Sequence, residues 1–108
     1  MGLIQGMKIK AVCDSLRMDK DTTDVMVQIH ALTKGGKLGK EYFDSPQGKS
    51  LDSILSLMGK MGATGELKDQ VDGVKRMFDD KEYRNRMYSV YERDVLPRLA
   101  KYRFWDIF

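Results

Sequence analysis

The chain has 108 residues, of which 42% are hydrophobic and 32% are charged, and its formal net charge is +3. This length and composition predict one folded domain over residues 1–108, and they exclude a largely disordered chain. A single cysteine excludes an intrachain disulfide, and no apolar run is long enough to cross a bilayer. The N-terminal residues have no signal-peptide pattern. We therefore expect a cytoplasmic protein, of a cell or of an infected host cell, that contacts no membrane.

Hydrophobic residues recur with a period of two in the first half of the chain. The alternating positions are Met7, Ile9, Ala11 and Cys13 in one run and Val25, Val27, Ile29 and Ala31 in the next. Such alternation predicts half-buried strands, with Val12, Met26 and His30 on the opposite side from these residues. Residues 19–24 form a polar turn, residues 35–36 a Gly-Gly hairpin turn, and residues 38–43 a third strand. We therefore predict a three-stranded antiparallel meander over about residues 7–43.

After residue 45 the hydrophobic period becomes helical, and it predicts helices at about 50–59, 65–78 and 80–103. The apolar positions are Leu51, Ile54, Leu55 and Met58 in the first helix and Leu67, Val71, Val74 and Phe78 in the second. Ser50 and Thr64 are the expected N-caps. Pro97 lacks a backbone N–H and crowds the preceding turn, so we expect a kink just before it. Packing these helices on one face of the sheet gives an α+β fold.

Residue types that carry catalysis or bind metals are sparse. Cys13 and His30 are each the single residue of their type, and the predicted strands give no reason to bring them together. Three carboxylates in residues 19–24 could suit a hard cation, but the glycine and final glutamate of an EF-hand loop are absent. A solvated turn explains them better, and one Cys with one His does not make a zinc site. We expect a non-catalytic protein without a cofactor or a bound metal.

The C-terminal segment, residues 81–108, carries the whole charge excess and seven of the ten aromatic residues. Arginine interleaved with tyrosine and tryptophan suits phosphate contacts and base stacking. The expected phosphate contacts are Arg86, Arg93, Arg98, Lys101 and Arg103, helped by Lys34, Lys37 and Lys40 at the hairpin tip, and the expected stacking rings are Tyr88, Tyr102 and Trp105. The three lysines would equally protect a strand edge against unwanted pairing.

Two functions fit this sequence about equally well. The first is nucleic-acid binding, single-stranded or weakly sequence-specific, through the basic aromatic C-terminal helix. The second is a protein-binding adaptor or inhibitor, such as a small phage or plasmid factor, that docks through an exposed strand edge or its apolar tail. The tail residues are Phe104, Trp105, Ile107 and Phe108. They either dock into a partner or belong to the core, and an apolar tail beside an open sheet edge is compatible with a homodimer.

The chain also holds eight methionines. Unbranched, flexible thioether side chains can enrich an adaptable interface. Those that could do so are Met18, Met26, Met58, Met61, Met77 and Met87.

Overall fold

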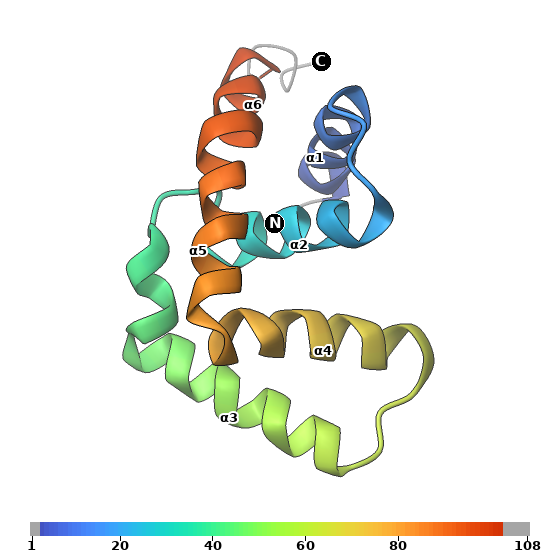
Figure 1. Cartoon of the computed structure of the whole chain (residues 1–108), viewed down its shortest axis with the longest axis vertical. Coiled ribbons are helices and arrows are strands. Elements are labelled where there is room, and N and C mark those ends of the chain that lie inside the picture. The colour runs from blue at the N-terminus through green and yellow to red at the C-terminus, as the bar shows by residue number, and fades with distance from the viewer. Residues whose placement is uncertain (1–2, 103–108) are drawn as a thin grey trace.

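The computed structural model describes residues 3–102, and within this range the chain is helical with no strand (Figure 1). The elements are α1 Leu3–Ser15, α2 Lys20–Leu32, η1 Lys40–Asp44, α3 Pro46–Lys60, α4 Gly65–Asp79, α5 Lys81–Val90, η2 Tyr91–Val95 and α6 Leu96–Tyr102. Of these, η1 is a 3-10 helix and η2 a π-helix. The predicted three-stranded meander over residues 7–43 and the α+β fold are therefore wrong.

The error in the first half has a clear physical origin. Residues four apart, such as Ile9 and Cys13 in α1, lie on one face of a strand and also on one face of a helix. The burial of the residues between them distinguishes a strand, with a period of two, from a helix, with a period of 3.6. Val12 in α1 and Met26 in α2 were assigned to the solvent side of strands, yet both are buried with the core residues beside them. Ala11, which the alternation placed inside, is exposed.

The polar run at residues 19–24 starts a helix and does not form a hairpin turn. The side chain of Asp19 caps α2 by accepting a 2.7 Å hydrogen bond from the backbone N–H of Thr22. Asp21 in the first turn also suits the positive end of the helix dipole. A capped start of this kind stabilises α2 by about 1 kcal/mol relative to an uncapped one.

The glycines at 35 and 36 do form a turn, but it joins α2 to η1. Both have positive φ, at 73° and 89°, a conformation that glycine adopts without a steric penalty. A Cβ atom on Gly36 would come within 3.1 Å of the Tyr91 hydroxyl and 3.0 Å of Leu96 Cδ1. The turn therefore lies against the junction of η2 and α6, far along the sequence. The expected third strand at 38–43 is occupied by loop residues and most of η1.

The helices expected at 50–59 and 65–78 correspond to α3 and α4. Helix α3 begins earlier than expected because Ser45, and not Ser50, is its N-cap, with Pro46 in the first helical turn. The Ser45 hydroxyl accepts a hydrogen bond of 3.1 Å from the backbone N–H of Gly48. Thr64 does occupy the cap position of α4, but its side chain makes no capping hydrogen bond.

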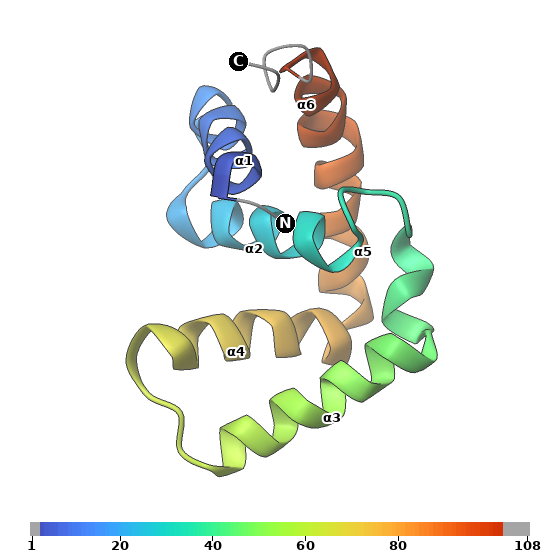
Figure 2. The same ribbon diagram turned by 180° about the vertical axis from the view of Figure 1, so that it is seen from behind.

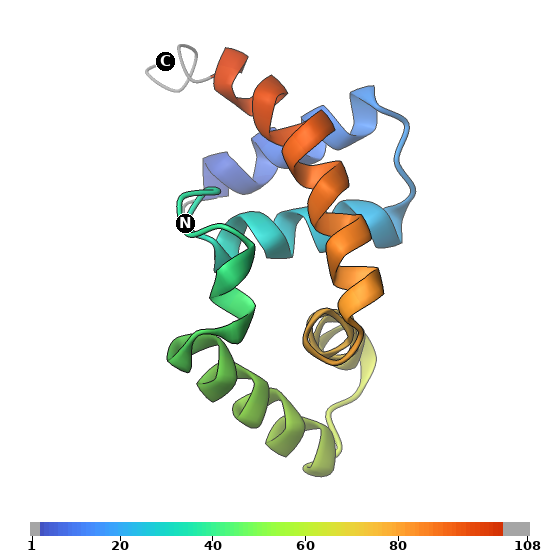
Figure 3. The ribbon, with the colours of Figure 1, turned by 60° about the vertical axis from the view of Figure 1, so that its left-hand side comes forward.

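The long C-terminal helix passes Pro97 through a π-helical turn. Leu96 donates its backbone N–H to the carbonyl of Tyr91, five residues back, so the turn is widened directly before the proline. A wider turn accommodates the proline ring and the missing N–H without ending the helix. Figure 3 shows α5, η2 and α6 as one rod that crosses α1 and α2. The irregularity expected before Pro97 thus takes the form of a π-helix.

The main core lies where this rod packs against α1 and α2. Its fully buried side chains include Ile9, Met26, Ile29 and Tyr91, one or two from each helix. Burying each such side chain contributes about 1.5–3 kcal/mol. Tyr91 keeps its hydroxyl satisfied through a 2.7 Å hydrogen bond to His30 Nδ1, as a buried hydroxyl requires.

Helices α3 and α4 form a hairpin at one end of the molecule (Figure 2). Helix α3 packs on α4 and η1, and its buried hydrophobic residue, Leu55, lies outside the main core. Lys75 of α4 bridges Asp52 of α3 at 2.5 Å and Asp79 of its own helix at 3.2 Å. In Figures 1 and 2 the two helices lie close together beside α5 and separate toward residues 61–64.

Candidate functional site

The predicted basic residues of the C-terminal helix that the structure describes are exposed, and three of them, Arg86, Arg93 and Arg98, already have partners. The Arg86 guanidinium lies over the Tyr83 ring, 5.6 Å from its centre. Arg93 makes two hydrogen bonds to the Asp94 carboxylate, at 3.1 and 2.8 Å, and these hydrogen bonds lower the pKa of Asp94. Arg98 donates from Nη1 to the Asp94 backbone carbonyl at 2.8 Å. Exposed pairs of this kind contribute little stability and can exchange for other partners.

These basic residues do not gather at one point. Arg86 in α5 and Lys101 in α6 are separated by about 20 Å of helix, at 1.5 Å per residue. Arg84, a further arginine of this segment, is 5% exposed and lies beneath η1, with Nη2 3.7 Å from an Asp44 oxygen. It is therefore not available to a nucleic acid.

The fold does bring the second predicted basic segment to this helix. Lys34, Lys37 and Lys40 are exposed on and beside the loop between α2 and η1. Because Gly36 of that loop packs on Leu96, the lysines lie near the junction of η2 and α6. The turn that carries Lys34 and Lys37 thus lies against the long helix, some 60 residues further along the chain.

Of the three aromatic rings predicted to stack on bases, only Tyr88 has a described side chain, and it is buried. Tyr88 is 3% exposed, and its ring lies 5.7 Å from that of Tyr91 in the core. Burial raises the pKa of its hydroxyl. The expectation that Tyr88 stacks on a base is therefore incompatible with this fold. Outside the described residues lie Arg103, Phe104, Trp105, Ile107, Phe108 and the side chain of Tyr102.

Cys13 and His30 are both buried, on α1 and α2. Burial raises the pKa of the Cys13 thiol, so the unreactive protonated form is favoured. Burial and the nearby charge of Lys8 lower the pKa of His30, whose Nδ1 lies 2.7 Å from the Tyr91 hydroxyl. Across residues 3–102, no three His, Cys, Asp or Glu side chains are placed to hold a metal ion. Nor does any helix in that range combine the length and apolar character needed to cross a bilayer.

A surface that the sequence reading missed lies on the hairpin of α3 and α4. Four large hydrophobic side chains are at least half exposed there, and we call them the hairpin surface: Ile54 (54%), Leu57 (57%), Met61 (77%) and Leu67 (50%). Ile54 and Leu67 had been placed on the packed faces of their helices. The sequence does contain a signal for this surface. At 100° per residue, the apolar residues of α3 cover an arc of about 160° around the helix. One neighbouring helix cannot bury so wide an arc, so part of it is expected to be exposed.

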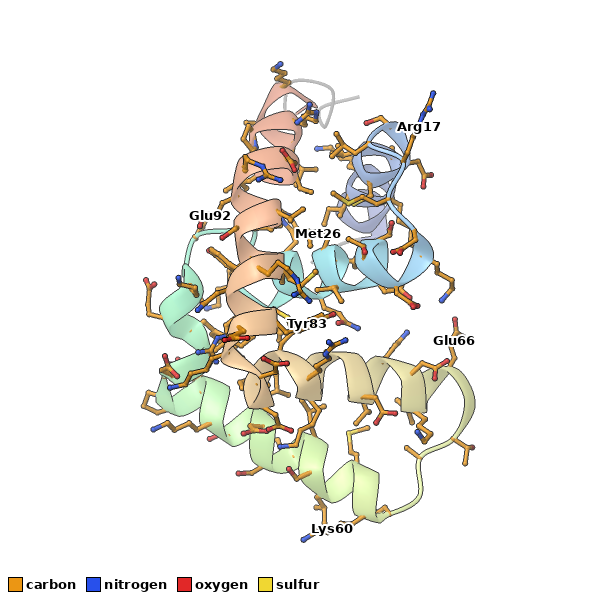
Figure 4. The ribbon with its side chains drawn as sticks, viewed as in Figure 1. Arg17, Met26, Lys60, Glu66, Tyr83 and Glu92 are labelled. Atoms are coloured by element: carbon orange, nitrogen blue, oxygen red, sulfur yellow. The ribbon has the colours of Figure 1, made fainter. Side chains whose placement is uncertain are left out.

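A cleft of about 390 Å³ separates α2 from α4 on the other side of the hairpin. Its lining residues are Lys20, Asp21, Asp24, Val25, Gln28, Asp69, Gln70, Asp72, Gly73, Arg76 and Tyr83. Figure 4 labels Tyr83 at the inner end of the space between the two helices and Glu66 toward its outer end. The Arg76 guanidinium stacks on the Tyr83 ring, 3.8 Å from its centre. We call this the α2–α4 cleft.

Comparison of the chain with protein-family models, curated proteins and solved structures found no match.

Proposed function

We propose that this chain is a small helical protein-binding module that docks an amphipathic helix of another protein on the hairpin surface. The observation that carries the proposal is that the exposed large hydrophobic side chains of the described chain all lie on α3, its C-cap residue Met61 and α4. Scattered exposed hydrophobic residues are normal on a monomer, whereas a contiguous group of them marks an interaction site.

The spacing on α3 supports a helical partner. Ile54, Leu57 and Met61 follow i, i+3, i+7, which is the narrow seam that one helix presents to another in a coiled coil. Leu67, in the first turns of α4, is half exposed as well. A partner helix laid along α3 would cover the seam in the manner of helix-in-groove recognition. The strand edge considered for docking is not available, because the described chain has no strand.

Site-specific photo-crosslinking tests the proposal. A benzophenone side chain replaces Leu57, and in a matched control it replaces Asn85, which is also exposed but lies on α5. The expected result is a crosslink to a defined protein from Leu57 alone, mapped to an amphipathic helix and lost in the Ile54→Ser/Met61→Ser variant. Because both residues are at least half exposed, that variant keeps its fold. Identical products from positions 57 and 85 contradict the proposal, and a crosslink to a second copy of this chain replaces it with a homodimer.

Nucleic-acid binding is the second candidate, and the meeting of the two basic segments favours it. The exposed Lys34 and Lys37 flank the turn that packs on Leu96, two residues before the exposed Arg98 of the long helix. Fluorescence anisotropy with labelled single-stranded DNA, RNA and duplex DNA at two salt concentrations decides this candidate. Binding that weakens with salt, and weakens further in Lys34→Gln/Lys37→Gln, supports it. No binding at low salt excludes it, because non-specific phosphate contacts are strongest there.

We retain a cytoplasmic location as part of the proposal. A lone cysteine suits a reducing compartment.

A further inference from the structure

The uncompensated charges of α3 are all positive. Its ionisable side chains are Lys49, Asp52 and Lys60. Asp52 is neutralised by the Lys75 ammonium of α4, which pairs with its carboxylate at 2.5 Å. Lys49 and Lys60 are exposed, and neither makes an ion pair within residues 3–102. Helix α3 therefore presents two free cations to solvent and no free carboxylate.

These two lysines border one edge of the seam on α3. At about 100° per residue, Lys60 lies about 60° and Lys49 about 80° beyond Leu57 around the helix. Ile54 lies on the other side of Leu57, toward the buried Leu55, so the opposite edge of the seam turns toward the buried side of α3. The two lysines are about 16 Å apart along the axis, and two carboxylates three turns apart on a partner helix can reach both.

The acids in the first half of α4 do not compensate these lysines. Asp69 and Asp72 line the α2–α4 cleft, and Figure 4 shows Glu66 on the same side of α4, the side that faces α2. In the same view Lys60 points away from α4. The rim of the seam is therefore cationic, although the chain as a whole is nearly balanced in charge.

An apolar seam with cations along its edge is complementary to a helix whose own apolar seam is bordered by carboxylates. A second copy of this chain is a poorer match, because pairing α3 with α3 adds two more cations and no free carboxylate. A membrane surface is a poorer match as well. Helices that lie on anionic lipid are rich in cations and carry aromatic side chains, whereas α3 has two exposed lysines and no aromatic residue.

We propose that the helix that docks on the hairpin surface is acidic, with carboxylates beside its apolar seam that pair with Lys49 and Lys60. This inference rests on the proposed function, because it specifies the chemistry of the helix that docks there.

Fluorescence anisotropy of two labelled helical peptides, titrated with the full chain, tests the inference. Both peptides have leucines along the seam and a hydrocarbon staple on the far face, and they differ only in glutamates or lysines beside the seam. The glutamate peptide is expected to bind at least about fivefold more tightly at low salt, and the difference shrinks at high salt because exposed charges are screened. Equal affinities, tighter binding of the lysine peptide, or binding of neither peptide overturns the inference.

A charge-matched pair of variants separates the two lysines from general attraction to a basic protein. Lys49→Gln/Lys60→Gln removes the rim cations, and Lys10→Gln/Lys101→Gln removes two exposed cations on α1 and α6, at the other end of the molecule (Figure 1). All four side chains are exposed, so both variants keep the fold. The preference for the glutamate peptide falls below about twofold in the rim variant and is unchanged in the control. Equal losses in the two variants overturn the inference.

Failure of this inference is distinguishable from failure of the proposed function. Equal binding of both peptides that is lost in Ile54→Ser/Met61→Ser overturns the acidic partner and leaves helix docking on the hairpin surface standing. A helix crosslinked from Leu57 that has basic or uncharged residues beside its seam does the same. Co-sedimentation with phosphatidylserine vesicles that is lost in Ile54→Ser/Met61→Ser assigns the surface to a membrane and overturns both.

Discussion

At the scale of single residues, the polar contacts of the main core centre on Tyr91. Its hydroxyl meets His30, and burial raises its pKa to about 12, so the hydroxyl stays neutral. Thr33 is fully buried nearby and donates to the carbonyl of Ile29 at 2.7 Å while accepting from Gly36 at 3.2 Å. These contacts connect α2, the glycine turn and η2, and they fix the long helix against the first half of the chain.

His30 should make the stability of the fold depend on pH. Its pKa is lowered in the folded state, first by burial and then by Lys8, so folding favours the neutral ring. This contribution is complete above the unfolded-state pKa of about 6.5 and is lost as the pH falls through the lower folded-state value. The free energy of unfolding, measured with urea, should therefore fall more between about pH 7.5 and pH 5 for the natural chain than for the non-titrating variant His30→Gln. An equal loss in both chains would show that His30 is not the group responsible.

At the scale of elements, two helical glycines have opposite surroundings. Gly73 in α4 faces the Gln28 amide at an ordinary contact distance of 3.5 Å, whereas a Cβ atom on Gly48 in α3 would overlap the carbonyl oxygen of Tyr42. The first glycine leaves room between α2 and α4, and the second allows α3 to pack closely on η1.

Exchanging these glycines for alanine should shift stability in opposite directions. Gly73→Ala is expected to raise the free energy of unfolding by about 0.5–1 kcal/mol, because alanine restricts the unfolded chain and fits the helix. Gly48→Ala is expected to lower it by more than about 1 kcal/mol, because the backbone of η1 must move. Thermal and urea unfolding of the two variants measure this contrast, and a gain in both would refute the packing described for α3 and η1.

At the scale of the whole molecule, α3 has fewer buried apolar contacts than the helices of the main core. Helix α3 packs on α4 and η1, contributes the buried Leu55 outside the core cluster, and is joined to α4 by the ion pair of Asp52 with Lys75. A segment with few buried apolar contacts opens locally before the rest of the fold.

Native-state hydrogen exchange should resolve this difference. The amides of Leu55 and Ser56 in α3 are expected to open with a free energy at least about 2 kcal/mol below that of Met26 and Ile29 in α2. Docking of a partner on the hairpin surface should then raise the protection of α3 selectively. Equal protection of α3 and α2 in the free chain would show instead that the molecule unfolds as one unit.

The sequence by itself determined the helices of the second half, the cap position of Thr64 and the concentration of charge at the C-terminal end. It did not determine the first half, because residues such as Ile9 and Cys13, four apart, suit a strand and a helix equally. Only packing of α1 and α2 against the distant Tyr91 decided that the neighbours between them are buried too. The exposure of the hairpin surface also depended on the tertiary structure. The helical period assigns each residue to a face of its helix, but the elements that pack on that face determine whether it is buried.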